Sequence, residues 1–444
     1  MIQLKGATVY SGNNLDILPT LPDNSVDSIV TDPPYELGFM GKKWDNSGIA
    51  YSVELWKECL RVLKPGGHLL SFGGTRTWHR VAVAIEDAGF EVRDSMAWLY
   101  GSGFPKSLDV SKAIDKAAGA EREVLGRNPN SREQAGKENT LYESGTVGKT
   151  AYETAAATEE AKQWQGWGTA LKPAFEPVVV ARKPLIGTVA ENVLTHGTGG
   201  LNIDGSRIGT TDTWKPSTRQ ANESIGTFQT GERTTEQHLA GRWPSNVLLD
   251  DYTAGLVDEQ SGQFKGQVGM VKTSSFVNHQ PTKRVKGQTF KTGVYDSGGA
   301  SRFFYVAKAS KRDRNEGLDG LEGKEIGAKG NGLARTCSTC GSSVLDGCDC
   351  PDRTFVNPER KNFHPTVKPT DLMRYLIKLV TPPNGVVLDP FTGSGSTGKA
   401  AILEGFEFIG IELTEEYLPI IEGRLKWAIE QASKKEEEKN EVLF

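Results

Sequence analysis

Two short motifs near opposite ends of the chain combine residue types that could carry chemistry. The first is TDPPY at residues 31–35, and the second is DPFTGSGSTGKAA at residues 389–401. In the first motif a carboxylate and an aromatic ring flank two prolines, which stiffen the backbone of the turn. In the second motif the glycines fit both G-x-G-x-x-G and G-x-x-x-x-G-K, the patterns of two phosphate-binding loops. The chain therefore contains a candidate nucleotide loop and a candidate acid–aromatic turn.

The glycine loop lacks a hydroxyl that phosphate cleavage requires. A P-loop places Ser or Thr after its lysine to hold magnesium, whereas Ala400 follows Lys399. A loop for an adenosine-containing cofactor instead requires an acidic residue at the end of the next strand, where it binds ribose hydroxyls. Glu412 ends the segment EFIGIE and meets this requirement. We therefore expect an adenosine cofactor, and we interpret Lys399 as an ordinary helix lysine.

The TDPPY turn has two interpretations. It follows the apolar segment VDSIV at residues 26–30, and by itself a proline-stiffened turn is compatible with a purely structural role. At the carboxyl end of a parallel strand, however, the same turn projects Asp32 and Tyr35 into the ligand crevice. The glycine loop elsewhere in the chain favours this second interpretation.

Strands and helices alternate in both end portions of the chain, which predicts an α/β sheet with helices on both faces. Strands are expected at residues 7–12, 26–30, 68–74, 91–100, 176–184, 384–391 and 407–412. Helices are expected at residues 51–67, 79–90, 370–380 and 395–406. The sheet is therefore assembled from both ends of the chain.

The motifs resemble those of a known family. DPPY, DPFTGSGST and the intervening HPTVKP at residues 364–369 resemble the amino-group DNA methyltransferases that use S-adenosylmethionine. Their order is similar to that of the circularly permuted group often called beta. The resemblance covers about residues 1–183 and 362–425. It implies a Rossmann-like methyltransferase fold with a mostly parallel seven-stranded sheet.

The resemblance assigns a role to each residue of the turn. An exocyclic amine on adenine or cytosine is a poor nucleophile, because its lone pair is delocalised into the ring. The Asp32 carboxylate and the Pro33 carbonyl would hold the amine hydrogens, with Pro34 completing the turn. Tyr35 would stack on a base flipped out of the duplex. Methylation at C5 of cytosine would need a cysteine nucleophile. Cys59 lies inside an expected helix and the other four cysteines cluster in a separate segment, so none follows a proline turn at a strand end.

The resemblance also implies a set of cofactor-binding residues. Glu412 would bind the ribose hydroxyls, Thr366 and Lys368 would close the pocket, and Lys368 would be available to the methionine carboxylate. At the position of Asn13 the family often has an acidic residue that contacts the adenine of the cofactor. Asn13 would make this contact through its side-chain amide, which can both donate and accept hydrogen bonds. The remaining residues of the expected pocket are Asp32, Asp389, Phe391, Gly393, Gly395, Ser396 and Thr397.

Segments without clear periodicity interrupt the two sheet-forming portions. Residues 101–165 are polar and are interpreted as an insertion with a helix around residues 151–164. The insertion as a whole could close over the DNA duplex. By position, the lobe after Pro184 corresponds to the target-recognition region of the family. The expected organisation is a first catalytic part at 1–184, a recognition lobe at 185–314, a cysteine-containing insertion at 315–361, a second catalytic part at 362–432 and a charged tail at 433–444.

Four of the five cysteines cluster in CSTCGSSVLDGCDC. Thiolates at this density resemble a small zinc knuckle, a closed structural site. The tight spacing of the second pair leaves His364 open as a replacement ligand, and reduced cysteines without metal are the alternative. The expected zinc ligands are Cys337, Cys340, Cys348 and Cys350.

The composition is that of a soluble globular protein, with 37% hydrophobic and 24% charged residues and a formal net charge of -4. Neither a membrane-spanning run nor a secretory signal is present, so we expect a cytoplasmic protein. Residues 265–314 contain eleven Lys or Arg against two Asp, interleaved with aromatic residues, a mixture suited to duplex DNA. Arg302, Lys308 and Arg312 are the candidate phosphate contacts.

These observations predict a site-specific DNA methyltransferase that methylates N6 of adenine after base flipping. The preference for adenine rests on family usage, because Asp before PPY is commoner in adenine enzymes and Ser in cytosine N4 enzymes. The alternatives are an N4-cytosine DNA methyltransferase, a DNA-binding protein with an inactive pocket, and methylation of RNA or of a protein amide. A homodimer and a cognate restriction nuclease both stay open.

Overall fold

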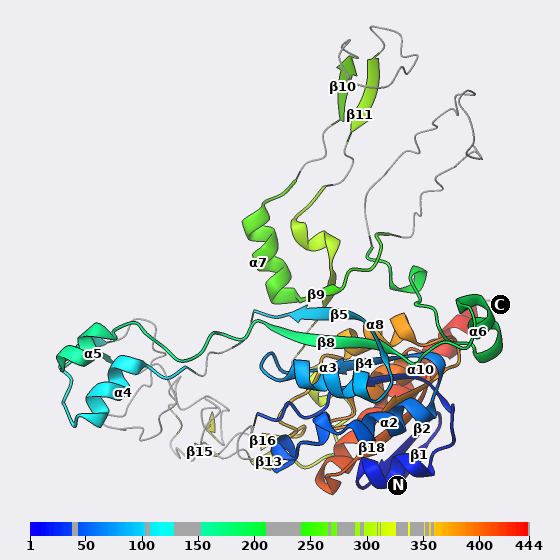
Figure 1. The fold of residues 1–444 in the computed structure, drawn as a ribbon, viewed down its shortest axis with the longest axis horizontal. Coiled ribbons are helices and arrows are strands. Elements are labelled where there is room, and N and C mark those ends of the chain that lie inside the picture. The colour runs from blue at the N-terminus through cyan, green and yellow to red at the C-terminus, as the bar shows by residue number, and fades with distance from the viewer. Residues whose placement is uncertain are drawn as a thin grey trace.

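A computed structural model gives the arrangement of most of the chain (Figure 1). It describes residues 1–37, 43–101, 103, 107–127, 152–209, 241–264, 268–272, 289–293, 297–308, 310, 312–325, 336–337, 350, 355–356 and 359–442. Among the helices of these residues, none is long and apolar enough to cross a membrane.

The seven strands predicted from sequence form the centre of one sheet. In spatial order they are β2 (Ala7–Ser11), β18 (Glu407–Glu412), β17 (Val386–Asp389), β3 (Val26–Thr31), β4 (Leu63–Phe72), β8 (Phe175–Arg182) and β5 (Glu91–Leu99). The first five run parallel to one another, and β8 pairs antiparallel with both β4 and β5. The Rossmann-like α/β fold is thus confirmed, including its assembly from both ends of the chain.

The strand count was wrong, because the sheet has ten strands. A hairpin adds β1 (Ile2–Leu4) beside β2, while β9 (Val247–Asp250) and β12 (Tyr305–Ala307) extend the sheet beyond β5. The stretch at 185–314 is therefore not wholly separate from the catalytic part. Its segments VLLD and YVA are too short to show a period-2 pattern, yet β9 finds hydrogen-bond partners on the open edge of β5 and β12 finds them on β9.

Helices cover both faces of the sheet. One face carries α2 (Val53–Val62) and α3 (Trp78–Asp87), and the other carries α8 (Thr370–Val380), α9 (Ser396–Leu403) and α10 (Leu418–Val442). Neighbouring residues of β3 point to opposite faces, since Ile29 packs with the first group and Val30 with the second. Each face therefore has its own hydrophobic core, and the sheet between them holds its strand ends in fixed positions.

The helix expected at residues 51–67 is shorter than predicted. Ser52 caps α2 by accepting a hydrogen bond from Leu55 N at 3.3 Å, but the helix ends at Val62 and β4 begins at once. Pro65 cannot donate a helical hydrogen bond, and Gly66 has a φ of 80°, so the chain leaves the helix before them.

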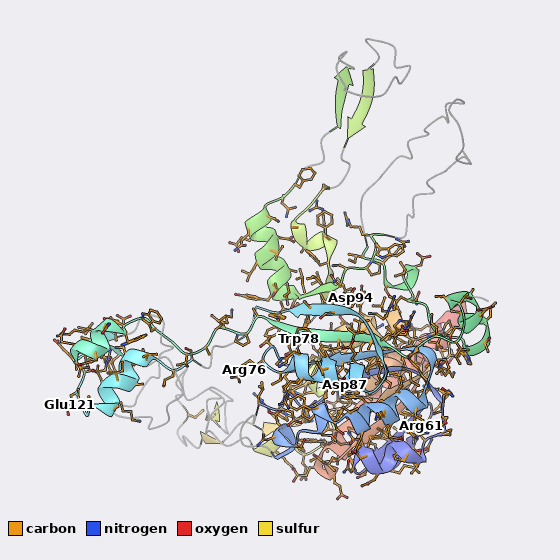
Figure 2. The ribbon with its side chains drawn as sticks, viewed as in Figure 1. Arg61, Arg76, Trp78, Asp87, Asp94 and Glu121 are labelled. Atoms are coloured by element: carbon orange, nitrogen blue, oxygen red, sulfur yellow. The ribbon has the colours of Figure 1, made fainter. Side chains whose placement is uncertain are left out.

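The polar insertion forms an arm that projects from the sheet (Figure 1). Figure 2 shows Glu121 on this arm, away from Arg61 and Trp78 on the sheet body. Within the region expected to contain a helix, α5 is five residues long. The arm contains α4 (Val110–Ala117), β6 (Val124–Arg127), β7 (Tyr152–Thr154) and α5 (Glu159–Gln163).

Shorter elements complete the described part of the chain. The hairpin β10 (Val268–Lys272) and β11 (Thr289–Gly293) stands away from the sheet beyond α7 (Asp251–Ser261) (Figure 1). The others are α1 (Asn14–Ile17), η1 (Leu18–Thr20), η3 (Lys43–Asn46), η4 (Ile49–Tyr51), α6 (Val189–His196), η5 (Asp204–Ser206), η6 (Ala300–Phe303), η7 (Asp313–Asn315), β13 (Lys324–Glu325), β14 (Thr336–Cys337), β15 (Phe355–Val356), β16 (Glu359–Arg360) and η8 (Glu415–Tyr417).

Candidate active site

The carboxyl ends of three adjacent parallel strands bring three predicted site residues together. Asp32 follows β3, Asp389 ends β17 and Glu412 ends β18. The Thr31 hydroxyl donates a hydrogen bond of 2.6 Å to Asp389 Oδ1, which ties two of these strand ends together. Parallel strands end at the same edge of a sheet, so the order of the strands explains why distant motifs form one site.

The side chains of the TDPPY turn meet Lys368 and Glu176. The Lys368 ammonium lies 2.6 Å from Asp32 Oδ2, 3.1 Å from the Tyr35 hydroxyl and 3.3 Å from Glu176 Oε2. The Tyr35 hydroxyl donates to Glu176 Oε2 at 2.9 Å. Asp32 Oδ1 is buried and has no hydrogen-bond partner. One oxygen of the Asp32 carboxylate is thus held by protein, and the other is available to a ligand.

The protonation states of this cluster follow from burial and from the two carboxylates. Burial lowers the pKa of Lys368, but Asp32 and Glu176 outweigh this effect and raise it overall, so the lysine carries its charge. Burial, and next the charges of Asp32 and Glu176, raise the pKa of Tyr35 well above its ordinary value. The Tyr35 hydroxyl therefore keeps its proton and acts as a donor.

Backbone and side-chain contacts fix the turn itself. The Thr77 hydroxyl donates to the Tyr35 carbonyl at 2.8 Å. Gly74 packs against the ring so closely that an added Cβ would lie 3.3 Å from Tyr35 Cβ. The carboxylate of Asp45 accepts hydrogen bonds from the backbone N–H groups of Glu36 and Leu37 at 3.0 and 3.3 Å. The ring of Tyr35 is consequently held in one position beside Asp32.

Glu412 organises the glycine loop. Its carboxylate accepts hydrogen bonds from Gly393 N at 2.7 Å and from Thr414 N at 2.8 Å. Gly393 and Gly395 have φ angles of 55° and 76°, a region that glycine enters without steric cost. Burial raises the pKa of Glu412 to about 7 against the opposing effect of these N–H donors, and burial raises the pKa of Asp389 to about 6.

The other predicted pocket residues lie around this loop with different degrees of exposure. Ser396 and Thr397 are buried at the start of α9, and Phe391 N donates to Asp389 Oδ1 at 3.0 Å. Asn13 is exposed and caps α1, because its Oδ1 accepts from Leu15 N at 3.1 Å. The buried neighbour Asn14 reaches the loop instead, donating to the Pro390 carbonyl at 3.3 Å.

The segment HPTVKP contacts both the TDPPY turn and the glycine loop, but its side chains differ in burial. Lys368 is buried and paired with Asp32 and Glu176, whereas Thr366 is exposed. The imidazole of His364 is buried against Tyr417 at a ring-centroid distance of 4.5 Å. An added Cβ on Gly393 would lie 3.1 Å from His364 Nε2, so His364 forms part of the wall behind the glycine loop.

The interpretation of Lys399 as an ordinary helix lysine is wrong. Its side chain is fully buried, and its ammonium lies 2.6 Å from Asp313 Oδ1 and 2.8 Å from Glu316 Oε2. Asp313 also accepts hydrogen bonds from the backbone N–H and the hydroxyl of Thr370. A buried lysine is stable only when carboxylates compensate its charge. Here Asp313 comes from the end of the expected recognition lobe and Glu316 from the start of the expected cysteine-containing insertion.

Sequence reasoning missed two residues at the site, the buried Arg424 and the half-buried Glu176. Arg424 of α10 donates to the Ser394 carbonyl at 2.8 Å and to the Ser396 hydroxyl at 3.0 Å, and so supports the loop from behind. Glu176 was missed because the strand starting there was judged only by its apolar residues. A charged residue at the start of an otherwise buried strand was the available signal.

The predicted DNA and zinc residues are only partly described. Arg302 is bonded to the carbonyls of Gly298 and Gly299 at 3.0 and 2.6 Å. Lys308 and Arg312 are exposed, and Arg312 lies 3.6 Å from Glu316.

Cys337 is buried and Cys350 is half-buried, while Cys340 and Cys348 lie outside the described residues. Within the described part of the chain no three potential metal ligands, including Cys337, Cys350 and His364, form a group. The four-cysteine zinc site therefore stays a prediction.

The fold and the site together define the class of protein. A Rossmann-like sheet carries a glycine loop after one strand, an acidic residue after the next and a DPPY turn after a third. The model of the family described as DNA methylase, which groups N6 and N4 methyltransferases, matches residues 26–423. The chain belongs to this family.

Curated relatives match shorter stretches. The putative methylase YubD of Escherichia coli K12 is 47% identical over 77 residues, which is 17% of this chain and 34% of that protein. The DNA adenine methyltransferase YhdJ of the same organism is 44% identical over 70 residues, or 16% of this chain and 24% of that protein. The type II methyltransferase M.HindIII of Haemophilus influenzae is 23% identical over 238 residues, covering 44% of this chain and 64% of the relative. The matches thus span less than two thirds of these relatives.

Two solved structures align over most of the chain. The M1.HpyAVI–SAM complex covers 94% of this chain and 100% of its own, at 16% identity and a TM-score of 0.36. The cytosine-N4-specific PvuII DNA methyltransferase covers 94% of this chain and 86% of its own, at 14% identity and a TM-score of 0.41.

Proposed function

We propose that the protein transfers the methyl group of S-adenosylmethionine to N6 of adenine in duplex DNA. The observation that carries the proposal is the buried, unpartnered Asp32 Oδ1, on a carboxylate that Lys368 joins to the Tyr35 hydroxyl. The amine of a base stacked on Tyr35 would donate a hydrogen to this oxygen, with the Pro33 carbonyl as second acceptor. Both acceptors act on the lone pair of the amine and favour its attack through nitrogen.

The residues around the glycine loop fit the cofactor. Glu412 would accept the ribose hydroxyls, and Asp389, Phe391, Gly393 and Gly395 would line the methionine end. When bound, S-adenosylmethionine supplies a methyl group already activated by its positive sulfonium. The edge of the sheet suits a cation, because Asp32 and Glu176 lie beside Lys368, and Asp389 and Glu412 end the neighbouring strands β17 and β18. A phosphate would be repelled by the same carboxylates. The roles of Asn13, Thr366, Ser396 and Thr397 in this pocket are part of the proposal.

We propose for Lys368 a role different from the one that the sequence indicated. Its pairing with Asp32 Oδ2 occupies the oxygen that faces away from the free Oδ1. The lysine thereby orients the carboxylate. We therefore assign Lys368 to the residues that hold the target amine, and we propose that other groups of the glycine loop bind the methionine carboxylate.

Adenine rather than cytosine is proposed from the Asp of DPPY and from its usage in the family. Duplex DNA is proposed as substrate, with contacts from residues 265–314 and from the arm. The cytoplasm is the proposed location, and a homodimer or a paired nuclease is compatible with this function.

The substrate class is tested by incubating purified protein with methyl-labelled S-adenosylmethionine and three acceptors. Duplex DNA, structured RNA and unfolded protein are offered separately at equal mass. We expect label in duplex DNA at least tenfold above the other two. Retained cofactor binding without label in any DNA would favour an inactive pocket, and label mainly in RNA or protein would contradict the proposal.

A further inference from the structure

Glu176 is a charged group at the site to which the proposed transfer assigns no task. It stands at the start of β8, the strand that runs antiparallel to β4 and β5. An antiparallel strand begins at the edge where its neighbour ends. This places Glu176 beside the carboxyl end of β4, where Gly73 N donates to the Pro177 carbonyl at 3.0 Å.

A single oxygen of Glu176 receives two donors. Its Oε2 accepts the Tyr35 hydroxyl hydrogen at 2.9 Å and lies 3.3 Å from the Lys368 ammonium. Lys368 also donates to the Tyr35 oxygen at 3.1 Å. Tyr35, Lys368 and Glu176 therefore form a closed ring of hydrogen bonds, to which Asp32 is attached only through its Oδ2.

The Tyr35 hydroxyl needs an acceptor, because a buried hydroxyl without one loses the hydrogen bond that it makes in water. Burial has the largest effect on the pKa of this hydroxyl, and Asp32 and Glu176 both lie close enough to raise that pKa further. With Glu176 removed, Asp32 is the remaining carboxylate, and its Oδ1 is buried without a partner. If Glu176 did not accept from Tyr35, that oxygen would be the next acceptor available.

We propose that Glu176 is a positioning residue: it holds the Tyr35 hydroxyl and one side of Lys368 so that Asp32 Oδ1 stays open to the amine of the target base. This inference rests on the proposed function. It predicts that loss of Glu176 slows methyl transfer because the Tyr35 hydroxyl then donates its hydrogen bond to Asp32 Oδ1. This oxygen is then no longer free to accept a hydrogen bond from the amine of the base. It also predicts that Lys368 then pairs with Asp32 alone, which reduces the ability of that carboxylate to accept from the base.

The test compares Glu176→Ala, Tyr35→Phe and the double variant in single-turnover methyl transfer to duplex DNA. We expect Glu176→Ala to slow transfer by about ten- to hundredfold, the usual effect of losing a hydrogen bond that involves a charged group. The dissociation constant for S-adenosylmethionine, measured by calorimetry, should change less than about twofold. Glu422→Ala on α10, which removes a partly exposed carboxylate paired with Lys426, is the matched control and should leave the rate unchanged.

The double variant separates positioning from a structural role. Tyr35→Phe keeps the stacking ring but removes the hydroxyl that would occupy Asp32 Oδ1. The double variant should therefore transfer methyl groups several-fold faster than Glu176→Ala alone. Additive losses, or weakened cofactor binding with an unchanged rate, would overturn the role of Glu176. An inactive wild-type protein would instead contradict the proposed function, on which the role of Glu176 rests.

Discussion

At the scale of single residues, the account depends on the two oxygens of Asp32. Oδ2 is held by Lys368 at 2.6 Å, while Oδ1 is buried without a partner. Native proteins rarely leave a buried carboxylate oxygen unpaired without a functional reason. The side chain is therefore poised to accept one hydrogen bond from outside the protein.

Removing this acceptor should stop transfer without emptying the cofactor pocket. We expect Asp32→Ala to lower the single-turnover rate by at least about a hundredfold, the usual scale for one preorganised polar contact in a transition state. Affinity for S-adenosylmethionine should stay within a few-fold of wild type. Asp87→Ala, at an exposed position of α3 (Figure 2), is the matched control. Normal turnover at saturation combined with lost cofactor binding would contradict the role assigned to Asp32.

The raised pKa of Glu412 predicts a pH dependence of stability. Burial holds this pKa at about 7, whereas the unfolded carboxyl has a value of 4.5. Between these values the native state binds more protons than the unfolded state, so the free energy of unfolding falls as pH rises through this window. We expect the Glu412 contribution to fall by on the order of 2 kcal/mol between pH 4.5 and pH 7.5.

Urea denaturation at several pH values, compared between wild type and Glu412→Gln, measures this contribution. The glutamine variant cannot ionise at this position, so its stability should fall less steeply across the same window. Parallel curves for the two proteins would show that Glu412 titrates normally.

At the scale of elements, η7 joins the two halves of the cofactor site. Asp313 of this element contacts Lys399 of α9, which follows the glycine loop, and Thr370 of α8, which follows HPTVKP. A segment at the end of the expected recognition lobe thus fixes the spacing of two motifs. This junction, which is buried, gives Lys399 a structural role that its phosphate-loop pattern did not indicate.

Breaking this buried pair should destabilise the protein strongly. Lys399→Met removes the nearest cation from the half-buried Asp313 and Glu316, which keep only the more distant Arg424 and Arg312 at 3.9 and 3.6 Å. We therefore expect a loss of about 3 kcal/mol in the free energy of unfolding, the lower end of the cost of breaking a buried pair. Lys426→Met on α10 breaks a surface pair with Glu422 and should cost less than about 1 kcal/mol. Equal effects of the two substitutions, measured by chemical denaturation, would refute the structural role of Lys399.

The cysteine insertion is expected to hold one structural zinc ion. Protein purified without chelator should contain about one equivalent of zinc by mass spectrometry, and Cys340→Ser should lower it, because four thiolates close the site. Cys59→Ser, in a buried position of α2, should keep the zinc. A wild-type content far below one equivalent would rule out the knuckle.

The sheet could be predicted from sequence wherever its strands were long and apolar. The seven expected strands, and the motifs that end three of them, are found where the βαβ pattern placed them. The added strands β9 and β12 could not be predicted, because four- and three-residue segments acquire strand structure only from the edge they pair with.

The site shows the same limit. Asp32, Tyr35 and Glu412 follow motifs with local signals, whereas Glu176 and Arg424 join the site through tertiary packing across long sequence separations.

At the scale of the whole molecule, a sheet body carries an arm inserted within its first sequence portion and a projecting hairpin from the segment between its two portions (Figure 1). The body contains the complete acid–aromatic and glycine-loop machinery, and the intervening segments are the proposed region of DNA contact. Under the proposed function, this division places the chemistry on packed strand ends, where positions are fixed, and assigns target choice to the inserted segments.

The most direct test of the account is the identity of the methylated nucleoside. Duplex DNA treated with the protein and S-adenosylmethionine is digested to nucleosides and analysed by mass spectrometry, with Asp32→Ala as the negative control. We predict N6-methyladenine with wild type and none above background with the variant. N4-methylcytosine as the sole product would contradict the assignment of the base, and equal N6-methyladenine from wild type and Asp32→Ala would contradict the assignment of the site.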